Sequence, residues 1–243
     1  MTYILLVAGK GSRLHPLTLN YPKSLYRLDA DTTILKRMVQ LIRRNDSNAE
    51  IVVVLGFQSE SIRKELSGLI FVENPFYECT NSIASLWFGK EYLNRDHVVI
   101  INGDIVLEER VVSDILCKPS EKPKVCIDSS IKNDGDYNVQ VSDERILVMS
   151  KDLSHYYGEY AGVTRLERKS AGKLYDCICK MVSNGMYDQW YENALVQMIF
   201  NEDFKLYYDD LNGYRWTEVD CVDDMLLARK IHSDEQYFND FIK

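Results

Sequence analysis

The pattern of apolar and polar positions divides the chain into two parts. As far as about residue 120, continuous apolar runs alternate with segments whose apolar residues recur every three or four positions. The continuous runs are typical of strands covered on both faces, and the longer spacing is typical of amphipathic helices. The predicted strands are 3–8, 50–55, 69–73 and 98–101, and the predicted helices are 33–45, 59–67, 80–93 and 109–117.

The pattern changes from Lys124 onward, where short pieces with alternating apolar and polar residues are separated by turn residues. This alternation is typical of antiparallel strands that expose one face. The predicted strands here are 124–128, 137–142, 145–150 and 159–166. Helices 168–184 and 190–201, strands 204–209 and 215–219, and a closing helix 222–232 follow.

The order of these elements predicts an α/β fold with a mostly parallel, mixed central sheet flanked by helices. The length of 243 residues and the hydrophobic content of 46% suit one domain with a sizeable core. Because no linker rich in Pro, Gly or Ser divides the chain, we expect residues 1–243 to form a single domain. Its two halves, about 1–120 and about 121–243, would share the sheet.

Charge and cysteine content exclude several classes of protein. A net charge of −8 argues against binding to nucleic acid or to an acidic membrane surface, since both need clustered cations. The six cysteines are scattered without a C-x-x-C pair, which indicates reduced thiols in a cytoplasmic protein and no zinc site. No apolar run approaches the roughly 20 residues that span a bilayer, and no signal peptide is evident.

The first predicted strand ends in a loop suited to an anion. The loop carries Gly9, Lys10, Gly11 and Arg13, and Lys23 follows ten residues after Arg13. Glycines let backbone N–H groups close on a phosphate, and nearby cations add charge-assisted hydrogen bonds. The spacing fits neither a P-loop nor the dinucleotide fingerprint, which also argues against an NAD-dependent oxidoreductase. A polyphosphate is therefore the expected ligand.

Carboxylates at two places are candidates for a magnesium site. Asp104 follows the apolar run 98–101, where open α/β sheets place their ligands. Glu218 and Asp220 follow the last predicted strand, and the two-residue spacing puts them on one face. Mg²⁺ binds oxygen and typically uses one or two protein carboxylates together with substrate phosphates.

The amino-terminal string resembles the opening motif of the nucleotidyltransferases that activate small phosphorylated molecules. Residues 6–18 read LVAGKGSRLHPLT and residues 22–25 read PKSL, with the gap between the two pieces intact. Val7 departs from the alanine that is more usual there. The resemblance implies a Rossmann-like, three-layer nucleotidyltransferase fold and a Mg²⁺ ion held by Asp104 and Asp220.

Shorter pieces are similar to one branch of that family, the cytidylyltransferases acting on phosphocholine and on aminoethylphosphonate. They are NPFY at 74–77, NSIASL at 81–86, SK at 150–151, GEYAG at 158–162 and TEVDCVDD at 217–224. No hexapeptide repeat is present, so the β-helix domain of some sugar-nucleotide enzymes is not expected. The first half of the chain would then bind the nucleotide and the second half the acceptor.

The resemblance implies Mg²⁺-dependent transfer of CMP from CTP to a small phosphorylated or phosphonate acceptor, with release of pyrophosphate. Such a product would serve capsule or surface-glycan and lipid decoration. Arg13 would clamp the β- and γ-phosphates, and Lys23 would lie between the acceptor phosphate and the α-phosphate. The residues expected around the nucleotide are Ala8, Gly9, Lys10, Gly11, Ser12, Asn81 and Ser82.

Aromatic residues are abundant, with 16 tyrosines and 3 tryptophans. An aromatic face beside a carboxylate suits an amine, as in phosphocholine, aminoethylphosphonate or an amino-acid phosphate. The acceptor-site candidates are Glu159, Tyr160, Trp190, Glu192 and Trp216. An equally open interpretation is that these rings fill the core and a contact between the subunits of a homodimer.

Two alternative functions stay open at this stage. One is a sugar-1-phosphate nucleotidyltransferase that uses UTP or dTTP, because no residue distinguishes cytosine from uracil. The other is a regulatory module that binds a nucleotide without catalysis, against which the presence of Arg13, Lys23, Asp104 and Asp220 argues.

Overall fold

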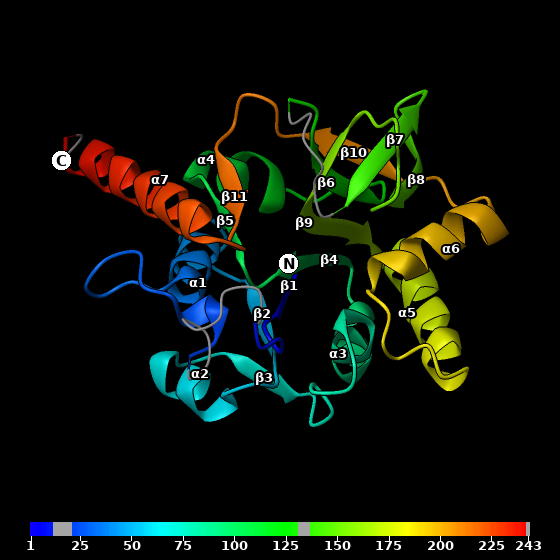
Figure 1. The fold of residues 1–243 in the computed structure, drawn as a ribbon, viewed down its shortest axis with the longest axis horizontal. Coiled ribbons are helices and arrows are strands. Elements are labelled where there is room, and N and C mark those ends of the chain that lie inside the picture. The colour runs from blue at the N-terminus through cyan, green and yellow to red at the C-terminus, as the bar shows by residue number, and fades with distance from the viewer. Residues whose placement is uncertain (12–20, 131–136, 242–243) are drawn as a thin grey trace.

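The computed structural model describes residues 1–11, 21–130 and 137–241, with side chains as far as residue 235. Figure 1 shows a central sheet with helices on both sides. The strands of this sheet are β1 (Thr2–Leu6), β2 (Glu50–Leu55), β3 (Ile70–Glu73), β4 (His97–Asn102), β6 (Lys124–Asp128), β7 (Asn138–Ser142), β8 (Arg145–Ser150), β9 (Gly158–Glu167) and β10 (Tyr207–Asp210). Within the described residues their order is β3-β2-β1-β4-β9-β6-β10-β8-β7.

The mixed sheet predicted from the sequence is confirmed, and its parallel part is the amino-terminal half. Strands β3, β2, β1 and β4 are all parallel neighbours, with Leu6 of β1 beside Asn102 of β4. Beyond β4, the pairs β4–β9, β6–β9, β8–β10 and β7–β8 are antiparallel, and β6–β10 is parallel. Of the strands predicted from alternating residues, β7 and β8 carry exposed positions, whereas β6 and β9 lie inside the sheet and are buried on both faces, so the expectation of one exposed face is wrong for these two.

A small second sheet of two antiparallel strands lies beside the main one. It consists of β5 (Ile105–Leu107) and β11 (Trp216–Glu218), with Glu218 opposite Ile105. The sequence analysis did not predict β5, because a run of three apolar residues directly after the turn at 102–104 carries no pattern of its own. This sheet brings the carboxyl end of β11 next to the turn that follows β4.

The helices form the outer two layers of a three-layer sandwich. Their bounds are α1 Ile34–Asn45, α2 Ser59–Glu65, α3 Ser82–Phe88, α4 Glu109–Val111, α5 Arg168–Ser183, α6 Glu192–Glu202 and α7 Val222–Phe241. Alternate residues of β1 pack on opposite faces of the sheet. Tyr3 and Leu5 pack on the side of α1, whereas Ile4 and Leu6 pack on the side of α3 and α5. Figure 1 shows α1 and α2 on one side of the sheet and α3, α5 and α6 on the other.

Several element bounds differ from the prediction for local reasons. The predicted helix 80–93 is interrupted at Gly89, so α3 is followed by a 3₁₀ turn at Lys90–Leu93. The helix predicted at 109–117 continues from α4 as a π-type turn over Val112–Leu116. Helix α7 continues past the predicted end at residue 232 as far as Phe241, and in this extension Glu235 accepts hydrogen bonds from Arg37 and from the Glu109 N–H.

The two halves of the chain meet inside one sheet, since β4 pairs with β9 along five residues. The division into a nucleotide-binding and an acceptor-binding half stays a prediction. Among the described residues, no helix combines the length and the apolar character needed to cross a membrane.

Candidate active site

The site lies at the carboxyl ends of β1 and β4, where open α/β sheets bind their ligands. The loop 7–11 follows β1, and Gly103 and Asp104 form the turn after Asn102, the last residue of β4. The backbone N–H of Gly103 donates to the Leu6 carbonyl oxygen at 2.9 Å, which fastens the two loops together. A Cβ at Gly103 would lie 2.4 Å from Val7 Cγ1 and 2.6 Å from the Leu6 oxygen, so only glycine fits this close approach.

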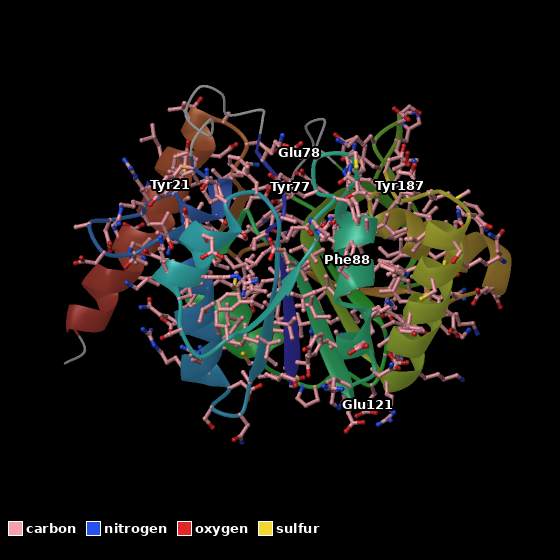
Figure 2. All side chains as sticks on the ribbon, turned by 90° about the horizontal axis from the view of Figure 1, so that it is seen from below. Tyr21, Tyr77, Glu78, Phe88, Glu121 and Tyr187 are labelled. Carbon is pink, nitrogen blue, oxygen red and sulfur yellow. The ribbon has the colours of Figure 1, made fainter. Side chains whose placement is uncertain are left out.

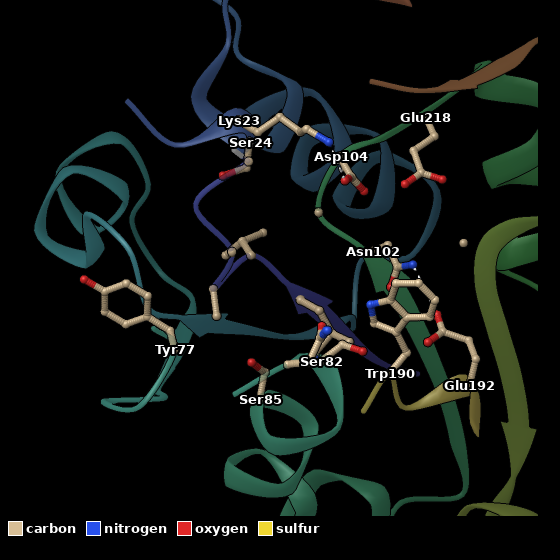
Figure 3. A pocket seen from close by; sticks show the side chains of 18 of the residues that line it. Lys23, Ser24, Tyr77, Ser82, Ser85, Asn102, Asp104, Trp190, Glu192 and Glu218 are labelled. Atoms are coloured by element: carbon tan, nitrogen blue, oxygen red, sulfur yellow. Dashed lines mark hydrogen bonds and ion pairs between the residues drawn. The ribbon is translucent and has the colours of Figure 1, made fainter. Parts of the chain in front are cut away.

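These two loops line a cavity of about 240 Å³. Figure 3 shows Lys23, Asp104 and Glu218 along one side of the cavity, and Trp190 and Glu192 on the other side of Asn102. The amino-terminal loop, the turn after β4, β9 and the start of α6 all contribute to the lining. Segments from both halves of the chain therefore meet at a single cavity.

Three carboxylates gather beside it. One oxygen each of Asp104, Glu218 and Asp220 lies within 4.8 Å of the others. The backbone holds this arrangement, because the Val219 N–H donates to the Asp104 carbonyl oxygen at 3.0 Å. The Asp224 carboxylate, in the first turn of α7, accepts from the N–H groups of Asp220 and Cys221 at 2.9 and 2.8 Å. Asp224 thus caps the helix and does not join the cluster.

The ammonium of Lys23 forms ion pairs with two of these carboxylates, Asp104 and Asp220. Its ammonium donates to Asp104 Oδ2 at 3.0 Å and also to Asp220 Oδ1. The residue is only 7% exposed and lies in the short 3₁₀ turn Lys23–Leu25, which Pro22 starts in an extended conformation. Burial lowers the pKa of Lys23, but the charges of Asp104 and Asp220 outweigh burial, and its pKa lies above the usual value. The ammonium is therefore protonated at neutral pH.

The donor set fits a hard divalent cation. Three carboxylate oxygens within 4.8 Å of one another match the oxygen ligands that Mg²⁺ prefers, and substrate phosphates would supply further ligands. The resemblance assigned the ion to Asp104 and Asp220, and Glu218, the third candidate carboxylate of the sequence analysis, lies in the same cluster. These three residues are the ones that would hold the ion.

The glycine-containing loop faces the cavity only in part. Ala8, Gly9 and Gly11 line it, and Gly11 has a φ of +64°, which glycine adopts without strain. Lys10 is not among the lining residues, because its ammonium pairs with Glu78 at 2.6 Å. Arg13 and Ser12, the other predicted contacts of the nucleotide, lie outside the described residues.

Lys10 lies at the end of the molecule that carries the loop 74–81. Its ammonium is 5.8 Å from the centre of the Tyr77 ring, and Tyr77 itself lines the cavity. Figure 2 shows Tyr77, Glu78 and Tyr187 at one end of the molecule and Glu121 at the opposite end. Lys10 therefore connects two loops at the edge of the cavity rather than reaching into it.

Asn81 and Ser82 line the cavity, but their polar groups already have partners. The Asn81 side chain caps α3 by accepting from the Ser82 N–H at 2.8 Å. The Asn81 N–H donates to the Tyr187 carbonyl oxygen at 3.0 Å, and Ser82 Oγ accepts from the Tyr191 N–H at 2.9 Å. The start of α3 is thus fastened to the segment before α6 and does not expose a row of N–H groups.

Aromatic residues form the other end of the cavity. Tyr160, Trp190 and Tyr137 line it, and the Trp190 and Tyr137 rings meet edge to face at 5.5 Å. The Tyr160 hydroxyl is directed into the core, where it bonds to Tyr191 at 2.5 Å and to Thr164 at 3.0 Å. Tyr160 therefore presents its ring to the cavity and keeps its polar end bonded to the protein.

Glu192 is a buried carboxylate at this aromatic end. It lines the cavity, is 4% exposed, and accepts a hydrogen bond from Asn102 Nδ2 at 3.3 Å. Burial raises the pKa of Glu192 from 4.5 to about 7, and the negative charge of Asp104 acts in the same direction. The Asn102 amide opposes this shift but does not cancel it.

Two predicted acceptor residues do not line the cavity. Trp216 is 8% exposed within the core, and its indole N–H donates to Asp128 Oδ2 at 2.8 Å. Glu159 lies in β9 between its neighbours Asp128 and Asn138. The structure thus brings Tyr160, Trp190 and Glu192 together and leaves Trp216 and Glu159 apart from them.

The lining residues that the sequence analysis did not name as site residues include Asn102, Tyr137 and Lys151. Asn102 could have been found, because it is the last residue of the strand that precedes Asp104. Lys151 belongs to the SK pair after the β7–β8 hairpin, and its ammonium lies 4.0 Å from the centre of the Trp190 ring. Tyr137 carries no local signal that separates it from a core tyrosine.

Comparisons with known proteins agree with this architecture. The choline-phosphate cytidylyltransferase of Streptococcus pneumoniae is 27% identical over 242 residues, covering 97% of this chain and all of the relative. The solved structure of CTP:phosphocholine cytidylyltransferase (LicC) from Streptococcus pneumoniae has a TM-score of 0.76 at 22% identity, covering 95% of this chain and 98% of that one.

A second solved structure has the same fold. The inositol-1-phosphate CTP transferase from T. maritima has a TM-score of 0.76 at 21% identity and covers 95% of each chain. Residues 3–165 match the MobA-like NTP transferase domain, a span that runs from β1 through β9 and includes the glycine-containing loop, Lys23 and Asp104. The chain belongs to the MobA-like NTP transferase domain family and is a nucleotidyltransferase.

Proposed function

We propose that this protein transfers CMP from CTP to a small phosphorylated or phosphonate acceptor with an amine group, releasing pyrophosphate. One observation carries the proposal: the glycine-containing loop, Lys23 and the three carboxylates converge on the cavity whose other end is aromatic and contains Glu192. The similarity to choline-phosphate cytidylyltransferase over the full length of both chains supports CTP as the nucleotide. The product would be an activated head group for capsule, surface-glycan or lipid decoration.

In the proposed reaction an oxygen of the acceptor phosphate attacks the α-phosphorus of CTP. The bond between the α-phosphorus and the bridging oxygen breaks, and pyrophosphate leaves with the electron pair. Both reactants are anions, so catalysis depends on positioning and on neutralising charge rather than on a covalent intermediate. A Mg²⁺ ion held by Asp104, Glu218 and Asp220 would neutralise phosphate charge and orient the leaving group.

Lys23 is the residue of this chain that is best placed to act on the reacting phosphate. Its ammonium is buried, protonated and held in place by Asp104 and Asp220. The ammonium therefore needs little rearrangement to stabilise the negative charge that develops on the phosphate in the transition state. Residues of the glycine-containing loop line the same cavity, where they would contact the nucleotide. The role assigned to Arg13 stays a prediction, because Arg13 is outside the described residues.

The experiment is a pyrophosphate-release assay with CTP, UTP, dTTP and ATP against a panel of acceptors, with and without Mg²⁺. The panel contains phosphocholine, phosphoethanolamine, aminoethylphosphonate, an amino-acid phosphate and a sugar 1-phosphate. We expect release only with CTP and Mg²⁺ and only with acceptors of the amine type. A preference for UTP or dTTP with the sugar phosphate would replace this proposal by the alternative function.

Two variants connect the activity to the site. Asp104→Asn removes one carboxylate charge of the cluster and should lower the rate about 10²-fold or more. Asp176→Asn is the matched control, because it changes an exposed carboxylate on α5 away from the cavity. Equal rates for both variants would show that the reaction takes place elsewhere.

A further inference from the structure

The aromatic end of the cavity combines three features that bear on the acceptor. Glu192 is a buried carboxylate that accepts a hydrogen bond from Asn102 at the long distance of 3.3 Å. The Lys151 ammonium lies over the Trp190 ring, 4.0 Å from the centre of the ring. The Tyr137 hydroxyl donates to Asn193 Oδ1, so it is already bonded within the protein.

A quaternary ammonium such as choline is usually recognised by aromatic faces, because it has no N–H group to donate. Here the face of Trp190 is covered by a cation of the protein itself, Lys151. A second cation on that face would be repelled by the first and would gain less from the ring. The Trp190 ring is therefore a poor site for a trimethylammonium group.

A primary ammonium, in contrast, suits Glu192. A carboxylate buried this deeply is costly to ionise unless a cation or several donors compensate it. The backbone N–H of Glu192 itself and the long bond from Asn102 do so incompletely, because the pKa of Glu192 is still raised to about 7. Among the residues that the structure describes, the charged and titratable groups that bear on Glu192 are Asp104 after β4, Tyr160 on β9, and Tyr137 and Tyr191, and none of these four is cationic. An ammonium that enters with the acceptor would supply both the charge and the donors.

We propose that Glu192 selects the acceptor by accepting hydrogen bonds from a primary ammonium group, and that Lys151 on Trp190 disfavours trimethylammonium. This inference rests on the proposed function and narrows it to phosphate or phosphonate acceptors with a short aminoalkyl chain. The expected acceptor differs from the one named for the similar choline-phosphate cytidylyltransferase. We attribute this difference to Lys151 and Glu192 of this chain.

The test compares two acceptors that differ only in three methyl groups, phosphoethanolamine and phosphocholine. With CTP and Mg²⁺, we expect kcat/KM to be at least about tenfold higher for phosphoethanolamine, since only its primary ammonium can donate charge-assisted hydrogen bonds to Glu192. In Glu192→Gln, kcat/KM should fall about 10- to 100-fold for phosphoethanolamine and less than about threefold for phosphocholine. The loss should lie mainly in KM, because Glu192 contacts the ground-state head group.

Two controls keep the result interpretable. Glu202→Gln makes the same change at the exposed end of α6 and should alter neither acceptor. The dissociation constant of CTP, measured for Glu192→Gln, should equal that of the wild type and shows that the variant is folded. Three results would overturn the inference and leave cytidylyl transfer intact. They are a kcat/KM for phosphoethanolamine equal to or below that for phosphocholine, an equal effect of Glu192→Gln on both acceptors, and activity only with a hydroxyl-bearing acceptor. Absence of transfer from any nucleotide to any acceptor refutes the proposed function, and the inference with it.

Discussion

Replacing Lys23 by methionine tests the central electrostatic feature of the site. The variant keeps an apolar stem of similar length and removes the ammonium that bridges Asp104 and Asp220. In the wild type the Lys23 side chain is 8% exposed, and those of Asp104 and Asp220 are 23% and 22% exposed. Removal of the ammonium leaves two neighbouring carboxylates with little access to water.

The magnitude follows from these distances. At 3.0 Å and an effective dielectric constant of about 20, one pair of unit charges attracts by roughly 5 kcal/mol. Desolvation of the ammonium offsets part of this, so removing Lys23 should cost about 2–4 kcal/mol in the free energy of unfolding. For a chain of this size the melting temperature should fall by about 5–15 °C. Activity should fall about 10²- to 10³-fold, the usual effect of losing one well-placed donor.

The assay is thermal unfolding during a titration with Mg²⁺, combined with pyrophosphate release. Because the two carboxylates of Lys23→Met lack their cation, Mg²⁺ should raise its melting temperature more than that of the wild type. Lys10→Met is the matched control, since the Lys10–Glu78 pair is exposed and screened by water and should contribute little to stability. Should Lys23→Met keep wild-type activity, or should Mg²⁺ leave its stability unchanged, the assignment of Lys23 and the carboxylates to one site would be wrong.

Three further outcomes are expected. Asp220→Asn should weaken Mg²⁺ binding measured by calorimetry and lower the rate about 10²-fold, while the capping of α7 by Asp224 is kept. Gly103→Ala should lower the rate and the melting temperature together, because its Cβ would lie 2.4 Å from Val7 Cγ1, and circular dichroism would show a folded protein. The pKa of about 7 for Glu192 means that the folded protein holds this proton more tightly than the unfolded chain. Stability should therefore fall by about 3 kcal/mol as pH rises from about 4.5 to 7, and denaturant unfolding of Glu192→Gln should lack this loss.

The sequence predicted the amino-terminal half of the fold well for a physical reason. Strands β1, β2 and β4 are buried on both faces, so their apolar runs stand out from the helices between them. The small sheet was not predictable, because β5 has three residues and its partner β11 comes from the far end of the chain. Non-local pairing of this kind leaves no trace in local periodicity.

The candidate site was predictable where a motif determines both the type of residue and its position in the fold. Lys23 and Asp104 were named from their spacing to the glycine-containing loop and from the end of β4, and the structure brings them within 3.0 Å. Lys10 has the same chemistry as Lys23 and lies within the motif, yet it pairs with Glu78 on another loop. Only the tertiary arrangement of loops 9–11 and 74–81 decides between an inward and an outward lysine.

The two tryptophans of the second half show why aromatic residues could not be sorted from sequence. The sequence analysis named Trp216 as an acceptor candidate only because it is an aromatic residue of the second half, although it shares one face of β11 with Glu218 by alternation. Trp216, however, lies roughly 7 Å further back along the strand, where it packs in the core and donates to Asp128. Trp190 precedes Glu192, the first residue of α6, and therefore reaches the cavity. The distance of an aromatic residue from the end of its strand or helix thus determines whether its side chain packs in the core or reaches the cavity. An error of two residues in the predicted end of the element is enough to give the wrong assignment.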